Sequence, residues 1–414
     1  MKLELNFFNV INTIRKTLNY IDETIINHGD ETAYIAYKLG TSLNLDEESL
    51  KSIVISSMLH DIGACKTEDL SDIINFENYN YIEHSVYGYL FIKYFSPISH
   101  MSKSILYHHE DIDNLKNTIE ENNANLIHIC DAVSVLKIKC SSYNEFEKNF
   151  IFNINDPKKY KQEYIDTLIK LHKEDSICKK LFDGSYLIEL NTYLNSFSYT
   201  QNELRKYIEL LGFSIDFRSG KTLTHSLAVS TVTKEICSIL NLDEKTKDIC
   251  TISALLHDIG KVSTPTRILK YPGILSNKDF NIMKGHVYKT REILNHLGNE
   301  KIKDIASNHH EKLNGRGYPR GLNKDMLTLE DRILSVADIF AALTEKRYYR
   351  DSLPKDEVLS ILRKCSLENE LDSDIVSIVS NNYDIILNLI KDELSKFNNK
   401  LKRINKEYKK LLSE

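Results

Sequence analysis

Apolar residues recur along most of the chain at the spacing of an α-helix. After His225 they follow about once per turn as far as Ile236 and Leu240. In the stretch 331–343, Asp338 is embedded in apolar residues, which is the pattern of a buried helix. Glycine (14) and proline (6) are scarce among 414 residues, and a turn-rich β architecture would need more of both. The pattern therefore predicts an all-α protein.

A different apolar pattern runs through the last 30 or so residues. Apolar side chains there alternate spacings of four and three, at Tyr383, Leu387, Ile390, Leu394, Phe397, Leu401, Ile404, Tyr408 and Leu411. The surface between them is rich in lysine. Two interpretations are open: a two-stranded coiled coil that forms a homodimer, or a long helix packed back on its own domain.

Before this C-terminal segment, the chain contains the same series of motifs twice. Leu-Asn-Leu-Asp-Glu at 43–47 recurs at 240–244, and His-Asp-Ile-Gly at 60–63 recurs at 257–260. Histidines and aspartates repeat in the same order around these motifs. The first set is His28, His60, Asp61, His84, His108, His109 and Asp131, and the second is His225, His257, Asp258, His286, His309, His310 and Asp338. Ten of the 14 histidines fall in these sets, which indicates an internal duplication.

The repeat predicts two tandem helical domains, over 1–195 and 200–385, followed by a C-terminal helix over 386–414. The stretch 197–201 reads as the connection between the domains. Within it Thr200 is a suitable N-cap for the next helix.

Composition and net charge exclude several classes of partner and location. The net charge of −5 provides no overall basic field, so we expect no DNA partner. No apolar run approaches the roughly 20 residues of a membrane-spanning helix, and the start of the chain lacks a signal-peptide pattern. The seven cysteines are scattered, with no Cys-x-x-Cys pair, which favours reduced thiols. We expect a cytoplasmic protein that does not bind membranes.

Each histidine–aspartate set has the chemistry of a metal site. One such histidine alone would more often be an ordinary core or surface residue, but an ordered set that occurs twice favours metal binding. A buried carboxylate such as Asp338 needs a cation or hydrogen-bond donors. Five imidazoles and two carboxylates suit two ions that share a bridging carboxylate, for which Asp258 is the candidate. Nitrogen and oxygen ligands without thiolate favour Fe, Mn or Zn. Ions about 3.5–4 Å apart are a common device for hydrolysing phosphate esters.

Further motifs in the second domain carry a family resemblance. They are His257-Asp-Ile-Gly-Lys261, His309-His310-Glu311, Gly315-Arg-Gly-Tyr-Pro319, Ala337-Asp-Ile-Phe340 and Arg347-Tyr-Tyr-Arg350. Over roughly 220–355 the chain resembles the HD-GYP subfamily of the HD metal-dependent phosphohydrolases. The N-terminal domain resembles only the looser HD pattern of His, His-Asp and Asp.

The resemblance implies an all-α fold of two HD-type domains, a di-iron or di-manganese centre, and hydrolysis of a bacterial cyclic dinucleotide by a metal-bridging hydroxide. The substrate would be cyclic di-GMP or 3′,3′-cyclic GMP-AMP. By the same resemblance, one ion would be held by His225, His257, Asp258 and Asp338, and the second by Asp258, His286, His309 and His310. Asp258 and Lys261 would be catalytic, with Lys261 on the scissile phosphate. Further substrate contacts would come from Tyr318, Arg347 and Arg350.

Some positions depart from the family pattern. Certain members carry a Glu ligand for a third ion where this chain has Lys221, which favours two ions. Asn314 and Ala341 stand where the family often has Asp. In the N-terminal domain the position of Lys261 is Ala64, and no Gly-Tyr-Pro loop follows the paired histidines. We therefore expect that domain to bind metal in a structural, sensory or dimerising role. The contrary hypothesis is a second phosphohydrolase.

Two other functions compete with the cyclic dinucleotide phosphodiesterase. One is a nucleotide or phosphomonoester hydrolase of the wider HD superfamily, which the Gly-Tyr-Pro loop disfavours. The other is a non-catalytic signalling scaffold that binds a cyclic dinucleotide or metal. Retention of Lys261 and of all seven ligand types speaks against the scaffold.

Overall fold

The computed structural model describes residues 3–20, 27–65, 81–218, 224–345 and 352–412. Every regular element in these ranges is a helix, which confirms the all-α prediction. The chain divides into two compact units. The N-terminal unit is 18–207 with 407–414, and the C-terminal unit is 1–17 with 208–406. None of the described helices is long and apolar enough to span a membrane.

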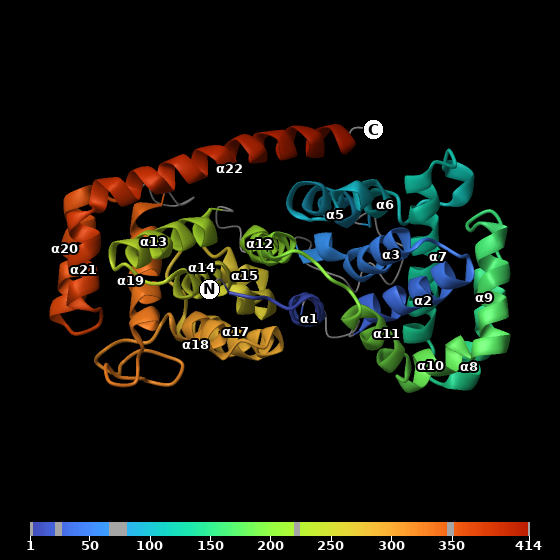
Figure 1. Ribbon diagram of the computed structural model, residues 1–414, viewed down its shortest axis with the longest axis horizontal. Coiled ribbons are helices and arrows are strands. Elements are labelled where there is room, and N and C mark those ends of the chain that lie inside the picture. The colour runs from blue at the N-terminus through green and yellow to red at the C-terminus, as the bar shows by residue number, and fades with distance from the viewer. Residues whose placement is uncertain (1–2, 21–26, 66–80, 219–223, 346–351, 413–414) are drawn as a thin grey trace. The chain divides into compact units, whose positions relative to one another are not determined.

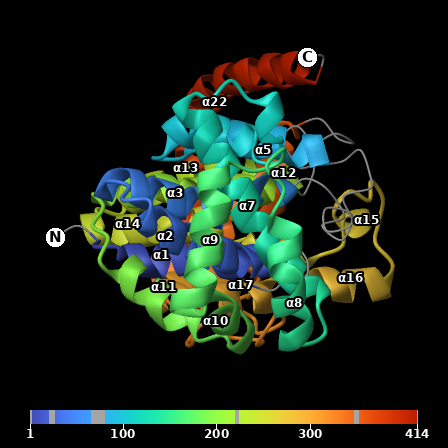
Figure 2. The ribbon, with the colours of Figure 1, turned by 90° about the vertical axis from the view of Figure 1, so that its right-hand side faces the viewer.

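The N-terminal unit contains the first histidine–aspartate set, and Figures 1 and 2 show its α-helices. Its helices are α2 (His28–Ser42), α3 (Glu47–Leu59), η2 (Ile62–Cys65), α5 (Tyr81–Phe95), η3 (Ser99–Met101), α6 (Ser102–Leu106), η4 (Ile112–Asn114), α7 (Ile119–Lys139), α8 (Tyr143–Ile154), α9 (Gln162–Asp175), α10 (Ile177–Asp183) and α11 (Tyr186–Asn195). The core of the unit is α2, which packs on α3, α7, α9 and α11.

The C-terminal unit contains the second set and most residues of α1, α12 and α22. Its helices are α1 (Phe7–Asn19), α12 (Gln201–Arg218), α13 (His225–Ile239), α14 (Glu244–Leu256), η5 (Ile259–Ser263), α15 (Thr266–Leu269), α16 (Asn277–Lys284), α17 (His286–Leu294), η6 (Asn295–Leu297), α18 (Glu300–Asn308), α19 (Leu329–Thr344), α20 (Lys355–Leu367), α21 (Ser373–Asn381) and α22 (Tyr383–Leu411). Residues 1–17 belong here, and not with the rest of the 1–195 range. The amide of Leu3, for example, donates to Asp248 at 3.4 Å.

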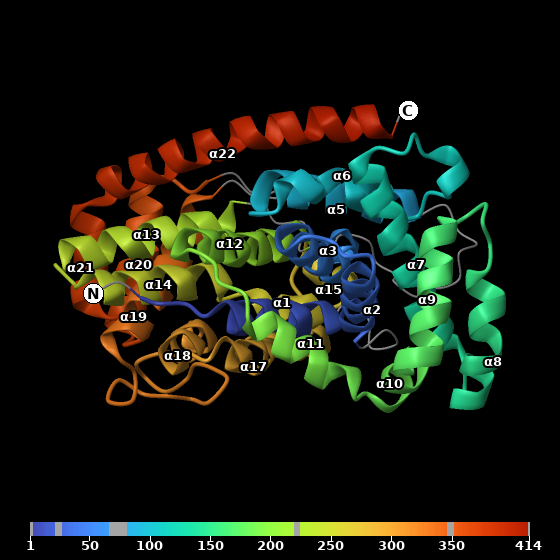
Figure 3. The same ribbon diagram turned by 45° about the vertical axis from the view of Figure 1, so that its right-hand side comes forward.

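The duplication extends to the packing of the helices. In the N-terminal unit α2 packs on α3 and α7 (Figure 3), and η2 packs on α5. In the C-terminal unit α13 packs on α14 and α19, and η5 packs on α17. The same pairs of elements therefore bring both sets of candidate ligands together.

The repeated Leu-Asn-Leu-Asp motif forms the same helix–turn–helix connection in both units. Its asparagines, Asn44 and Asn241, take left-handed backbone with φ of 56° and 52°, which asparagine tolerates better than most residues. Its aspartates cap the next helix. Asp46 accepts from the Ser49 amide at 3.0 Å, and Asp243 accepts from Lys245 at 3.0 Å. Four residues of sequence thus specify where one helix ends and the next begins.

Threonine caps begin three further helices. The Thr200 amide donates to Glu203 at 2.8 Å and its hydroxyl accepts from the Glu203 amide at 3.3 Å, so the predicted cap is confirmed. The same reciprocal arrangement starts α7 at Thr118 and α19 at Thr328. The helices that carry Asp131 and Asp338 are therefore both started by a local capping box.

The C-terminal apolar seam lies on one continuous helix, α22. In the C-terminal unit Tyr383 contacts Phe340 with ring centroids 5.4 Å apart, and Phe397 contacts Phe213 at 4.9 Å. These contacts favour the second interpretation, a long helix packed back on its own domain. A coiled-coil homodimer stays a prediction.

Candidate metal centres

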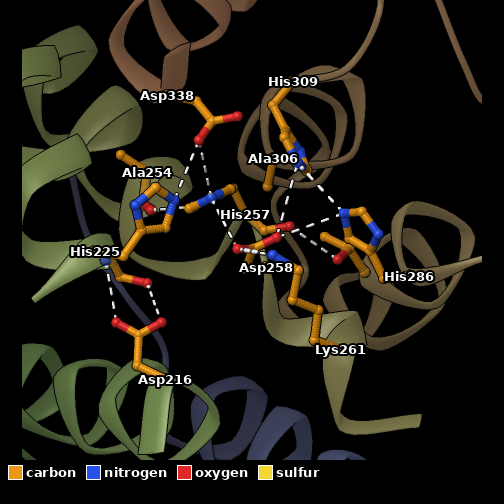
Figure 4. Close-up of polar contacts among 12 residues, drawn as sticks. Asp216, His225, Ala254, His257, Asp258, Lys261, His286, Ala306, His309 and Asp338 are labelled. Atoms are coloured by element: carbon orange, nitrogen blue, oxygen red, sulfur yellow. Dashed lines mark hydrogen bonds and ion pairs between the residues drawn. The ribbon is translucent and has the colours of Figure 1, made fainter. Parts of the chain in front are cut away.

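Five segments of the C-terminal unit carry the second set of side chains (Figure 4). His225 begins α13, His257 and Asp258 follow α14, His286 begins α17, His309 and His310 follow α18, and Asp338 lies within α19. Figure 4 labels all of these residues except His310. Six of the seven residues are buried and His310 is half-buried. The structure therefore brings together all seven residues that the sequence singled out.

Asp258 lies between two groups of imidazoles. Its Oδ1 is 3.5 Å from Nε2 of His286 and 3.9 Å from Nε2 of His309. Its Oδ2 is 3.3 Å from Nε2 of His257. A carboxylate with one oxygen toward each group has the geometry of a bridge between two cations.

Asp338 lies beside the group of imidazoles that contains His225 and His257. Its Oδ1 is 3.2 Å from Nε2 of His225 and 3.9 Å from Nε2 of His257. On the other side of Asp258, ligand atoms of His286, His309 and His310 lie within 4.8 Å of one another. Each group thus offers enough nitrogen and oxygen atoms for one ion.

Hydrogen bonds on the far side of each ring orient the imidazoles. Nδ1 of His257, His286 and His309 donates to the carbonyls of Ala254, Met283 and Ala306, each at 2.7 Å. A ring whose Nδ1 donates presents the lone pair of Nε2, and all three Nε2 atoms face the centre. This is the arrangement of metal-ligating histidines.

The protonation states also fit a metal. Burial lowers the pKa of His286 to about 3 and of His309 to about 4. Burial acts to raise the pKa of Asp338, but its hydrogen bond with His225 and nearby histidines outweigh this and hold the pKa well below the usual value. Neutral imidazoles and an ionised carboxylate are the forms that bind metal ions. The residues of this centre therefore fit bound metal.

Glu345 was not identified from the sequence. Its Oε2 accepts a hydrogen bond from Nδ1 of His225 at 3.1 Å, and both side chains are buried. Burial lowers the pKa of His225, but the contacts with Asp338 and Glu345 outweigh it and raise the pKa to about 9. The adjacent carboxylate makes His225 a more basic ligand.

Asp216 was also missed. Its carboxylate accepts from the Ser226 amide at 3.1 Å and from the Ser226 hydroxyl at 3.0 Å. These bonds hold the first turn of α13, which carries His225 (Figure 4). Neither Asp216 nor Glu345 belongs to a motif, and only their contacts in the fold reveal them.

Lys261 and Tyr318 lie at the same centre. The ammonium of the buried Lys261 forms an ion pair with Oδ2 of Asp258. The ring of Tyr318 lies 4.8 Å from that of His310, and the Lys284 ammonium is 5.3 Å from the Tyr318 centroid. Lys284 is a further cation at this edge that sequence reasoning did not identify. Arg347 and Arg350, and also Lys221, lie outside the described residues.

Glu311 holds the Gly-Tyr-Pro loop in place. This buried carboxylate accepts from the amides of Arg320 at 2.6 Å and Leu322 at 2.8 Å. The Tyr318 amide donates to the carbonyl of His310 at 3.1 Å. The His-His-Glu motif therefore supplies candidate ligands and also the anchor that sets Tyr318 beside them.

The N-terminal unit repeats the centre. Oδ1 of Asp61 is 3.4 Å from Nε2 of His84, and its Oδ2 is 3.3 Å from Nε2 of His60. Oδ1 of Asp131 is 3.0 Å from Nε2 of His28. His109 completes a triad with His84 and His108, whose ligand atoms lie within 4.8 Å of one another. The donor set is that of the C-terminal unit, so these residues also fit metal.

The two centres differ around the bridging aspartate. Lys261 covers Asp258, whereas the matching residue in the N-terminal unit is the buried Ala64. The side chain of Asp61 is accordingly 15% exposed, against 5% for Asp258. At this position the N-terminal centre therefore has no counterpart of the Lys261 ammonium.

Comparisons with known proteins agree with the duplication. Two family profiles match the chain, both described as HD domain, over residues 25–136 and 206–375. Each range contains one complete set of candidate ligands. The crystal structure of a cyclic GMP-AMP specific phosphodiesterase of Vibrio cholerae aligns with a TM-score of 0.60 at 18% identity, over 94% of this chain and 100% of that chain. The likeness to that structure is one of fold.

Curated relatives match one or both halves. The 3'3'-cGAMP-specific phosphodiesterase 1 of Vibrio cholerae is 27% identical, over 89% of this chain and 90% of the relative. The 3'3'-cGAMP-specific phosphodiesterase 3 of the same organism is 35% identical, over 45% of this chain and 40% of the relative. A cyclic di-GMP phosphodiesterase of Thermotoga maritima is 32% identical, over 46% of this chain and 51% of the relative.

Proposed function

This chain is a tandem HD-domain protein, and we propose that its second domain is a phosphodiesterase that hydrolyses a cyclic dinucleotide. One observation carries the proposal. The carboxylate of Asp258 lies between two groups of imidazole Nε2 atoms and carries the ammonium of Lys261. With metal bound, that combination would set two cations and a fixed positive charge around one point, an arrangement that favours hydrolysis of an anionic phosphodiester.

The first substrate to test is 3′,3′-cyclic GMP-AMP. The relative that is similar along 90% of its own length is specific for it, whereas the cyclic di-GMP phosphodiesterase of Thermotoga maritima matches about half of this chain. Cyclic di-GMP is the second candidate substrate. Because these substrates are intracellular messengers, we propose that the protein works in the cytoplasm.

The proposed cofactor is a pair of Fe or Mn ions. His225, His257 and Asp338 would hold one ion, His286, His309 and His310 would hold the other, and Asp258 would bridge them. When bound, such a pair supplies an activated water and neutralises charge on the phosphoryl oxygens. The hydrogen bonds from Nδ1 to backbone carbonyls keep the ligating Nε2 atoms oriented.

The chain's own side chains would bind and polarise the substrate. Lys261 would shift its ammonium between Asp258 and the scissile phosphate, where it stabilises the negative charge that develops during attack. Burial, together with Asp258 and Asp338, raises the pKa of the Tyr318 hydroxyl, so at neutral pH this hydroxyl is a hydrogen-bond donor. Roles for Arg347 and Arg350 in phosphate binding stay predictions.

The test is hydrolysis by the full chain, loaded anaerobically with Mn²⁺ or Fe²⁺. Each cyclic dinucleotide is incubated with the protein and the products are separated by chromatography. We expect a linear dinucleotide or mononucleotides from at least one substrate. The double variant His257→Ala with Asp258→Ala should lose the metal of this centre and the turnover together.

The duplication supplies a matched comparison. The variant His60→Ala with Asp61→Ala makes the same change in the N-terminal centre. Turnover that disappears only in this variant would assign the chemistry to the N-terminal unit. Turnover at the wild-type rate in the variant of His257 and Asp258 would refute the proposed site.

A further inference from the structure

A cavity of about 470 Å³ opens beside the N-terminal centre. One wall is His109, a candidate ligand, whose ring lies 6.2 Å from that of His128. The ring of Tyr160 lies 5.0 Å from that of His128. Lys139 and Lys159 also line the cavity. The cavity is thus lined by a candidate ligand, by two further aromatic rings and by two lysines.

The aromatic wall is held by the fold. His128 and Tyr160 are buried, and Nδ1 of His128 donates to the carbonyl of Glu110 at 3.2 Å. Glu110 directly follows His109, so a single hydrogen bond fixes the wall to the segment that carries the candidate ligand. Rings held in this way form a preformed surface for an apolar or aromatic group.

The loop that carries Lys159 is pinned by a buried asparagine. Nδ2 of Asn125 donates to the carbonyl of Lys159 at 2.7 Å, and Oδ1 of Asn125 accepts from the Lys161 amide at 2.9 Å. The Ile112 amide also donates to the carbonyl of Lys159, at 2.9 Å. Asn125 is fully buried, so this lysine projects from a fixed backbone.

The charge in the cavity favours an anion. Lys139 lies in the last turn of α7 and Lys159 in the pinned loop, while Asp111 is the one carboxylate among the described residues that line the cavity. At the cluster the carboxylates of Asp61 and Asp131 would be more than balanced by two divalent ions. With such ions bound, the charge around the cavity would be mainly positive.

We infer that the N-terminal domain binds a small phosphate-bearing molecule in this cavity, with the phosphate between the metal cluster and Lys139 and Lys159. The volume lies within the range of about 300–1,000 Å³ that is usual for small-molecule sites. The aromatic wall of His128 and Tyr160 suits a ring on the organic part of the ligand. The cations that Ala64 cannot supply thus come from two other segments.

The inference is tested in the full chain that carries His257→Ala and His286→Ala, so that the C-terminal centre is disabled and the outcome is independent of cyclic dinucleotide hydrolysis. This protein is loaded with Mn²⁺ and titrated calorimetrically with inorganic phosphate and with phenyl phosphate. We expect saturable binding of both, with phenyl phosphate the tighter. The pair Lys139→Gln and Lys159→Gln should raise the dissociation constant at least about tenfold, without loss of bound Mn²⁺.

A matched pair controls for the loss of charge. Lys170→Gln with Lys173→Gln removes the same charge from the exposed face of α9, and the dissociation constant should then stay within about twofold of the parent. Two results would overturn the inference: a protein that retains Mn²⁺ but binds neither phosphate, or equal effects of the two lysine pairs. Circular dichroism and bound Mn²⁺ identify a variant that has merely failed to fold.

Discussion

Glu345 accepts a hydrogen bond from Nδ1 of His225 at 3.1 Å, on the side of the ring opposite the metal centre. The two residues are far apart in the sequence, and both are buried. On its other side His225 faces Asp338 through Nε2 at 3.2 Å. The imidazole is therefore held between two carboxylates, one at the centre and one behind it.

Removing Glu345 should weaken metal binding. Glu345→Ala leaves Nδ1 of His225 without its acceptor, and loss of such an outer carboxylate typically costs about 10–100-fold in metal affinity. Glu345→Gln keeps an acceptor oxygen and should lose less. Competition with a chelator measures the affinity for Mn²⁺. An affinity in the alanine variant equal to that of the wild type would contradict this role for Glu345.

Metal binding should strengthen as the pH rises toward 9. The pKa of His225 is about 9 in the metal-free protein, so below that pH an ion must displace a proton from this ring. Affinity then falls by up to about tenfold for each unit of pH below 9. Binding of Mn²⁺ measured between pH 6 and 9 in the variant of His60 and Asp61 reports on the C-terminal centre alone. Glu345→Ala should move the dependence to lower pH, because it removes a charge that raises this pKa.

Lys261→Gln should lower kcat by a larger factor than it lowers the amount of bound metal. The substitution keeps a polar side chain beside Asp258 but removes the charge expected at the scissile phosphate. Loss of one such stabilising group costs about 10²–10³-fold in kcat. Steady-state hydrolysis and metal analysis are done on the same preparation. An unchanged kcat would assign Lys261 a purely structural role.

Gly260→Ala should disrupt the C-terminal centre. A Cβ at this position would overlap the carbonyl of His286 and the amide of Thr290, where η5 crosses α17. Overpacking of this kind costs at least about 1–3 kcal/mol of stability. The temperature of thermal unfolding and the amount of bound metal should both decrease. As the control, Gly273→Ala meets only the side chain of Tyr271 and should change neither.

Much of the structure of this protein could be predicted from its sequence, because the patterns and contacts that determine it involve residues close together in the chain. Helix class follows from apolar periodicity. Element boundaries follow from side chains that bond to nearby backbone, as Asp243 does at α14 and Thr200 does at α12. The two ligand sets could be selected because a duplicated order of histidines and aspartates stands out against a chain with few other histidines.

Tertiary structure alone decided the features that depend on contacts between distant segments. No periodicity or motif indicates that Glu345 lies behind His225, that residues 1–17 join the C-terminal unit, or that Lys139 and Lys159 line one cavity. Such pairings are set by how buried helix faces pack together, and that packing couples side chains whatever their separation along the chain. Sequence patterns therefore specified the candidate ligands and the helices that carry them, whereas folding selected the residues that tune and surround them.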